Sequence, residues 1–258
     1  MSDIGGILSI SSQALLTQQK AMNVTSHNIA NVNTPGYSRQ RLRMSTNTPA
    51  SMSIGMVGSG VSADSVERIY DRFLSDQINV ENQELGRWDA QKGAVEVVET
   101  IFNESDGYGL NHVMSRFWEA WQSLTNNPTG QTERQILITD SQALARTFNQ
   151  LVSDLSQAQK DLDIIIEGTV SDVNRLSEQL VDLNQKIISA EADTSVANDY
   201  RDSREQVLKE LSKLIDIDSF EDAFGATHVL LSNGRPLVGG GQSWQLSTQI
   251  NASGLNDV

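Results

Sequence analysis

The sequence predicts a mainly α protein, an elongated helical bundle with long coiled-coil-like helices that ends in the start of a β-rich domain. Two observations support this fold class. Apolar residues recur at helical spacing over most of the chain, and only four prolines occur among its 258 residues. Beyond Ile215 the pattern changes to short apolar runs separated by Gly and Asn, as is typical of strands. We therefore expect three parts, namely 1–65, 66–215 and an apparently truncated β part at 216–258.

The first expected element is a helix over residues 4–30. Its apolar stripe is a narrow seam, because most positions three and four residues along from each seam member are Ser, Gln or Thr. Lys20 is the only charged residue between Ile4 and Ser38. A single helix with so thin a seam is marginal in water, so we expect a partner to order it. The alternative is a disordered tail. The seam consists of Leu8, Leu15, Met22 and Ile29.

A turn follows at residues 31–37, because Pro35 cannot continue a helix and Pro-Gly favours a turn. Residues 38–44 then alternate, which predicts a strand with Arg39, Arg41 and Arg43 on one face. We expect these arginines to face carboxylates or water. Residues 45–65 are rich in Ser, Thr and Gly and predict an extended loop, whose glycine spacing does not fit a dinucleotide site.

Three long helical patterns come next, at 66–102, 110–125 and 132–192, with a glycine-containing break at 103–109. Thr132 and Gln135 have the spacing of a capping box. Three of the four tryptophans lie between 88 and 121, so we expect the main core there. The third helix needs partners along its length, and those at 66–102 and 198–215 are the obvious ones.

Four strands are expected in the last part. The Asn233-Gly234 pair between two apolar runs predicts a tight hairpin, and the three glycines at 239–241 predict a loop. The expected strands are 217–220, 227–231, 235–238 and 244–249.

Composition excludes several functions. The chain has no cysteine, which removes disulfides and thiolate metal sites, and its three histidines are widely spaced. The net charge of −14 argues against a general nucleic-acid binder. No apolar run is long enough to span a bilayer, and the N-terminus lacks the basic region of an ordinary signal peptide. No catalytic motif is recognisable, and the carboxylates of Asp161, Asp163 and Glu167 are expected on a solvated helix face. We expect no enzyme activity, metal or cofactor.

The segment from Asn28 to Gln40, Asn-Ile-Ala-Asn-Val-Asn-Thr-Pro-Gly-Tyr-Ser-Arg-Gln, resembles the signature of bacterial flagellar rod, hook and hook-associated proteins. Within that axial family its Pro-Gly-Tyr-Ser-Arg-Gln ending is closer to the hook–filament junction members. Two further stretches support this likeness, residues 109–141 with Asn127-Pro128-Thr129 and residues 200–212. The resemblance covers essentially residues 1–240.

The resemblance implies a structural role, joining hook to filament by non-covalent packing in a helical or ring-shaped homo-oligomer. It implies the hook protein and the second hook–filament junction protein as partners, and an extracellular place in the flagellum after type III export. Family members carry a C-terminal helix that pairs with the N-terminal one and a C-terminal region that binds the export chaperone. This chain has neither pattern, so it looks like the N-terminal part of a longer protein, and the chaperone contact is in doubt. The expected subunit contacts are the seam together with Asn31, Asn33, Thr34, Pro35, Gly36, Tyr37 and Arg39.

Two other functions are alternatives to this role. The long seam at 137–187 alone would suit a soluble coiled-coil adaptor or secreted interaction protein. Such a protein needs neither the Asn31–Tyr37 turn nor the nearly uncharged helix before it, and it would tolerate deletion of 1–60. An enzyme would need a polar cluster in the β part, where Asp222, His228 and Arg235 are the only candidates.

Overall fold

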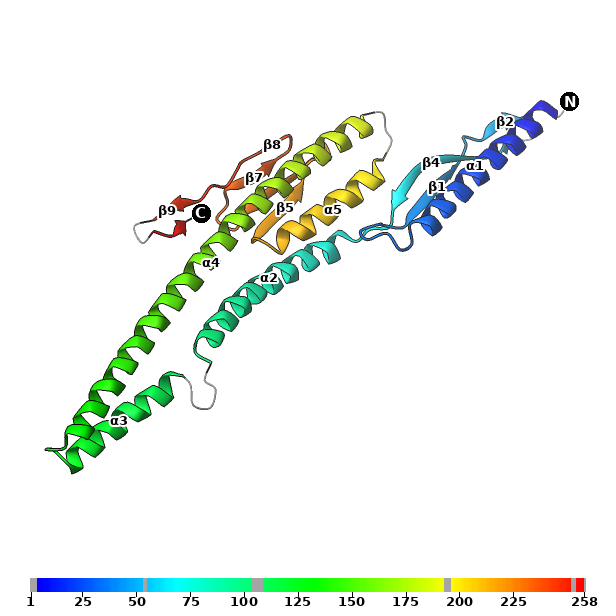
Figure 1. Ribbon diagram of the computed structural model, residues 1–258. Helices are drawn as coiled ribbons and strands as arrows, with labels where there is room; N and C mark the ends of the chain where they lie inside the picture. The colour runs from blue at the N-terminus through cyan, green and yellow to red at the C-terminus, as the bar shows by residue number, and fades with distance from the viewer. Residues whose placement is uncertain (1–3, 53–54, 104–108, 193–195, 252–253, 258) are drawn as a thin grey trace. The chain divides into compact units, whose positions relative to one another are not determined.

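A computed structural model describes residues 4–52, 55–103, 109–192, 196–251 and 254–257 (Figure 1). The chain divides into two compact units. The first combines Met1–Leu85 with Val173–Gln245, and the second combines Gly86–Asp172 with Leu246–Val258. Two helices pass from one unit into the other.

The first unit begins with helix α1, Ile4–Ala30, which agrees with the predicted helix. The prediction of an extended loop at 45–65 was wrong. Strand β1 (Gln40–Thr46) pairs antiparallel with β4 (Val61–Arg68), and β2 (Ala50–Met52) pairs with β3 (Gly55–Val57) between them. These strands are rich in Ser and Thr, so they lack the alternation of large apolar residues that identifies a strand.

Four further helices follow. Helix α2 spans Arg72–Ile101 and begins six residues later than predicted, because Val66–Arg68 end β4. Helix α3 spans Leu110–Asn126, and α4 spans Gln131–Glu191, 61 residues in all. Helix α5 spans Asn198–Ser212. Because α4 already includes Thr132, that residue is not its N-cap, contrary to the capping-box prediction. The predicted break at 103–109 lies mostly outside the described residues.

The first unit also contains a four-stranded antiparallel sheet in the order β5-β6-β7-β8. Its strands are Ile217–Glu221, Thr227–Leu231, Pro236–Gly239 and Gln242–Ser243. Gly234, with φ of 80°, forms the predicted hairpin between β6 and β7. The predicted strand at 244–249 was wrong, because residues 244–248 belong to no strand. The Trp244 ring instead lies so close to Gly239 that a Cβ there would be 2.8 Å from it.

The apolar core lies where α4, α5 and this sheet meet. Its α4 members recur at steps of three, four and seven residues, which places them on one helix face. The prediction of a core around the tryptophans was wrong, since Trp88, Trp118 and Trp121 are 60%, 62% and 45% exposed. The buried apolar residues of this unit are Val173, Leu176, Leu180 and Ile187 of α4, Leu208 and Leu211 of α5, Ile217, Val229, Leu237 and Val238 of the sheet, and Ala226 just before β6.

The second unit contains the rest of α2, α3, the first two thirds of α4 and a short C-terminal pairing. Arg116 of α3 donates to the buried Asp140 of α4 at 2.7 Å. Strands β9 (Gln249–Ile250) and β10 (Asn256–Asp257) pair antiparallel. The Asn256 backbone N–H and side chain donate to Asp163, and the side chain also reaches Glu167. The prediction that these two carboxylates are only solvated was wrong, because both accept hydrogen bonds from Asn256 of β10.

None of the helices in the described part of the chain is long and apolar enough to cross a membrane.

Candidate functional site

The predicted seam of α1 lies at the surface. Leu8, Leu15, Met22 and Ile29 are between 64% and 72% exposed, and Ile4 and Ile7 are exposed beside them. An apolar row of this length on a helix with one charge is unusual for a solvated surface, where charged residues normally cover the wet face. The structure therefore leaves the seam accessible to a partner.

A different face of α1 is covered within the chain. Ile10, Ala14, Ala21 and Val24 are half-buried, and Thr17 is buried, with its hydroxyl 3.5 Å from the Val61 carbonyl. At 3.6 residues per turn, this stripe lies about 130° around the helix from the seam. The β1–β4 pair that covers it thus keeps the seam turned outward.

The turn after α1 is held by local hydrogen bonds. The Asn31 amide donates to the His27 carbonyl at 3.1 Å, and the Thr34 hydroxyl donates to Asn31 at 3.2 Å. Gly36 has φ of 79°, a conformation that side chains disfavour, and it lies against Gln206 of α5. Pro35 is exposed.

Asn28 connects α1, the turn and β1. Its side-chain oxygen accepts from the Tyr37 hydroxyl at 2.7 Å and from the Gln40 backbone N–H at 2.8 Å. Its amide donates to the Gln40 carbonyl at 2.8 Å. The side chain therefore pairs with Gln40 as a neighbouring strand would, which fixes the direction in which the chain leaves the turn.

The end of the turn also binds α5. The Asp202 carboxylate accepts from the Ser38 backbone N–H at 2.8 Å and forms an ion pair with Arg68 at 2.9 Å. The side chains of Arg68 and Asp202 are only 9% and 7% exposed. One turn earlier on the same helix, the Asp199 carboxylate accepts from the side-chain amide of Gln40 at 2.9 Å. Burial and these two carboxylates raise the pKa of Tyr37.

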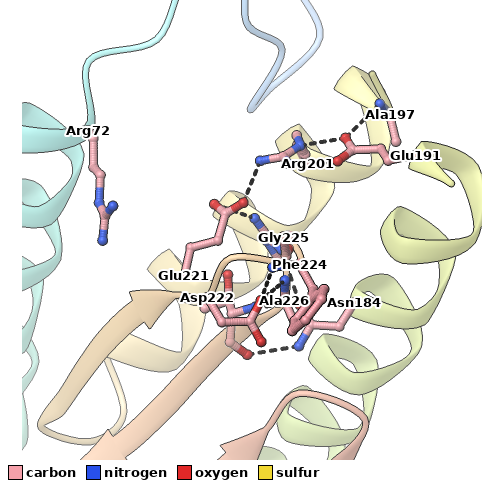
Figure 2. A network of polar contacts seen from close by, with 12 residues as sticks. Arg72, Asn184, Glu191, Ala197, Arg201, Glu221, Asp222, Phe224, Gly225 and Ala226 are labelled. Atoms are coloured by element: carbon pink, nitrogen blue, oxygen red, sulfur yellow. Dashed lines mark hydrogen bonds and ion pairs between the residues drawn. The ribbon is translucent and has the colours of Figure 1, made fainter. Parts of the chain in front are cut away.

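A second polar network holds α5 to α4 and the sheet (Figure 2). Figure 2 shows Arg201 between Glu191 and Glu221, with distances of 2.7 and 2.8 Å to them. Arg204, fully buried, donates to Asn184, to the Gly225 carbonyl and to Glu221. The Arg201 guanidinium lowers the pKa of Glu191, whereas burial lowers the pKa of Arg204. A buried cation with several acceptors fixes the geometry of the elements around it.

An open apolar groove of about 850 Å³ runs between the C-terminal half of α1 and β1. Ile29 of the seam lines it together with Val32, Leu42 and Ile69. Arg39 is exposed at its edge, while Arg41 and Arg43 both pair with Glu67, as expected of arginines facing carboxylates. Among the described residues, no group of three His, Asp or Glu side chains could hold a metal ion.

The predicted contact residues fall into two groups. The four seam residues, Asn33, Thr34, Pro35, Gly36 and Arg39 are exposed, whereas Asn31 and Tyr37 are half-buried. Four residues that contact the turn and the strand after it were not predicted from the sequence, namely Asn28, Arg68, Asp199 and Asp202. Asn28 and Asp202 lie in residues 28–40 and 200–212, which carry the family resemblance, but nothing in either stretch indicates that Asp202 accepts from the Ser38 N–H.

Comparisons with known proteins point to one family. The family model described as the flagellar hook-associated protein FlgK helical domain matches residues 95–257, and that of the flagella basal body rod protein matches residues 8–37. Flagellar hook-associated protein 1 of Bacillus subtilis (strain 168) is 36% identical over 212 residues, which cover 80% of this chain and 42% of that protein. The Salmonella typhimurium protein of the same name is 27% identical over 232 residues, covering 89% and 42%.

A solved structure gives the same result. The flagellar hook junction protein FlgK from Burkholderia pseudomallei aligns with a TM-score of 0.58 and 26% identity, covering 68% of this chain and 31% of that one. The chain thus spans about two fifths of the length of the curated relatives it matches. Because the helical-domain model matches more than half of the residues, the chain belongs to the family of the flagellar hook-associated protein FlgK.

Proposed function

We propose that the chain is a structural component of the bacterial flagellum that joins the hook to the filament, assembled by non-covalent packing of subunits. The observation that carries the proposal is the exposed apolar seam on a helix with a single charge, in a chain of this family. Burial of such a seam against neighbouring subunits would contribute about 1.5–3 kcal/mol for each large side chain. The chain's own residues offer binding surfaces, and the role needs no bond-making chemistry.

The proposed subunit contacts are the seam, the exposed turn residues Asn33, Thr34, Pro35 and Gly36, the half-buried Asn31 and Tyr37, and Arg39 beyond the turn. In this proposal, residues 66–215 form the helical bundle domain, which does not include the seam or the turn. Residues 216–258 form the start of a β-rich domain. The proposed partners are other copies of the chain in a ring or helix, the hook protein, and the second hook–filament junction protein. The proposed location is the extracellular flagellum, reached by type III export.

Two neighbouring leucines provide a matched test. Leu15 belongs to the seam, whereas Leu16 is also exposed but points about 100° away on the same helix. In the full-length protein, Leu15→Asp is expected to prevent incorporation at the hook tip and to abolish motility, because a charge would be buried in the contact. Leu16→Asp is expected to incorporate normally.

Immunogold labelling of hook tips and swimming assays measure this directly, and circular dichroism checks that both variants fold. Normal incorporation of Leu15→Asp would sink the seam assignment. Equal loss in both variants would also overturn it, since the contact would then not be confined to the seam. A coiled-coil adaptor would retain its binding after deletion of 1–60, whereas a junction subunit would lose assembly.

A further inference from the structure

The turn between β6 and β7 contains the one Asn-Gly pair of the sequence, Asn233-Gly234. Both residues are exposed, and Gly234 has φ of 80°, a conformation that glycine adopts without strain. A Cβ added at Gly234 would meet no other atom within 4 Å, so the space around the turn is open. The pair is thus accessible to water on the surface of the first unit.

An Asn-Gly pair can deamidate without an enzyme. The Gly234 nitrogen loses its proton and attacks the side-chain carbonyl carbon of Asn233. A C–N bond forms, and the side-chain nitrogen takes up a proton and leaves as ammonia. Water then opens the cyclic imide at either carbonyl, which gives aspartate or isoaspartate and needs no other reactant. Glycine favours the attack because it has no side chain to obstruct its nitrogen.

The folded hairpin restrains both reacting groups. The Gly234 N–H donates to the Leu231 carbonyl at 2.8 Å, and the Leu231 N–H donates to the Arg235 carbonyl at 2.8 Å. The Asn233 side-chain oxygen accepts from the Arg235 N–H at 3.0 Å, so this side chain cannot turn freely. A hydrogen-bonded amide must be released before it loses its proton, as in hydrogen exchange. Attack on Asn233 therefore requires the turn to open.

Buried side chains in the two flanking strands keep the turn closed. Val229 of β6 and both Leu237 and Val238 of β7 are fully buried, and Val229 is paired in register with Val238. Strand β6 also pairs with β5 on its other side, so it is an inner strand of the sheet. Separation of β6 from β7 would expose this core, so we expect the turn to open rarely in the folded chain.

We infer that Asn233 is a deamidation site that the folded hairpin closes and that unfolding opens. A chain that stays unfolded accumulates the modification, whereas a folded chain is protected from it. Aspartate keeps the backbone length of the turn. Isoaspartate instead carries the main chain through the side chain and lengthens it by one carbon, which conflicts with the tight turn and with the register of β6 and β7. Isoaspartate formed before folding therefore hinders assembly of the core of the first unit.

The rate of deamidation is measured on the chain itself, so the result does not depend on the proposed flagellar role. Samples are incubated at one mildly alkaline pH over a series of guanidinium chloride concentrations. Peptide mass spectrometry measures conversion at Asn233, and circular dichroism measures the unfolded fraction. A synthetic peptide of residues 229–238 gives the unprotected rate at each concentration. The rate in the chain is expected to follow the unfolded fraction and to be at least about tenfold below the peptide rate when folded.

Two variants test whether the hairpin core provides the protection. Leu237→Ala removes a fully buried side chain of β7, so it is expected to speed deamidation in the absence of denaturant. Ile165→Ala, at an exposed position of α4, is the matched control and is expected to keep the parent rate. A folded parent that deamidates as fast as the peptide would overturn the inference, as would a Leu237→Ala rate equal to that of the parent.

The effect of the product is measured separately. The isoaspartyl chain is purified after reaction in guanidinium chloride, and its refolding is compared with that of Asn233→Asp. The isoaspartyl chain is expected to unfold at a lower guanidinium chloride concentration than Asn233→Asp, which has the same charge and an ordinary backbone. Equal midpoints for the two would contradict the inferred effect on the hairpin.

Discussion

At the residue scale, Asn28 shows how one side chain can determine the path of a backbone. It makes three hydrogen bonds, two of them with the backbone of Gln40. Aspartate could not replace it, because the bond to the Gln40 carbonyl needs a donor. This requirement for both a donor and an acceptor gives a physical reason for asparagine at this position.

Replacement of Asn28 by Ala is expected to destabilise the segment formed by α1, β1 and β4 by about 1–3 kcal/mol, since it leaves the Tyr37 hydroxyl and the Gln40 backbone without partners. Hydrogen exchange of the β1 and β4 amides would measure the loss. Asn23→Ala on the same helix is the matched control, because Asn23 is exposed and should change exchange little. Because Ala favours a helix more than Asn does, propensity alone would make both substitutions slightly stabilising, and an Asn28→Ala variant that exchanges no faster than Asn23→Ala would contradict the role of these hydrogen bonds.

Glu191 and Arg201 predict an acid-sensitive contact. The Arg201 side chain holds the pKa of Glu191 below its usual value, with the Ala197 N–H adding to the effect. A depressed carboxyl pKa contributes stability that is present above the unfolded pKa, about 4.3, and is lost as pH falls through the folded pKa. Glu191→Gln is therefore expected to lower the free energy of unfolding at pH 7 and to flatten its decline below about pH 5. Urea titrations at several pH values test both effects.

Glu205 is expected to show the opposite sign. Burial raises its pKa, while a hydrogen bond from Tyr70 and nearby cations act against the rise. The carboxyl therefore costs stability when it is ionised, above its folded pKa. Glu205→Gln is expected to stabilise the protein at pH 7, with an advantage that shrinks as the pH falls through that pKa. The same urea titrations would contradict this if Glu205→Gln were destabilising at pH 7 and at pH 4 alike.

At the element scale, the sequence predicted the helices well and the N-terminal sheet poorly. Helix α1 and the 61-residue α4 follow from repeated apolar positions and from proline and glycine at their ends. The strand predicted at residues 38–44 is confirmed as β1, but its partner β4 and the β2–β3 pair were missed, because they contain few large apolar side chains. The buried Arg204 escaped prediction for a related reason, since its acceptors come from α4 and the sheet, far away in sequence.

Gly168 offers a test of α4 as a single helix. It lies within the helix, and a Cβ added there would meet no other atom within 4 Å. Gly168→Ala is therefore expected to stabilise the protein by about 0.5–1 kcal/mol, through higher helix propensity. Ala145→Gly, at an exposed position of the same helix, should lose a similar amount. Thermal unfolding of both variants checks this, and a destabilising Gly168→Ala would indicate that the helix is kinked or broken at this point.

At the scale of the whole molecule, the apolar core is unevenly divided. Of the thirteen apolar residues buried in the described part of the chain, eleven lie in the first unit. The two in the second unit are Ala120 and Ala158, which bury little surface. Trp88, Trp118 and Trp121 belong to that unit and are exposed, so their large apolar area adds little to its stability. This division explains why tryptophan content was a poor guide to the core.

The uneven core predicts unequal stability along one continuous helix. Amides of α4 within 173–191, which belong to the first unit, are expected to exchange more slowly than those within 131–172, because local opening requires less energy where few apolar groups are buried.

Two substitutions in α4 test this prediction. Leu180 is fully buried in the first unit, so Leu180→Ala should lower the free energy of unfolding by about 2–5 kcal/mol and, within α4, lower protection at 173–191 alone. Ile165→Ala, at an exposed position in the second unit, should change neither region appreciably. Site-resolved hydrogen exchange distinguishes the outcomes. If Leu180→Ala lowered protection equally along all of α4, the two units would open as one, and the unequal core would not determine how the molecule unfolds.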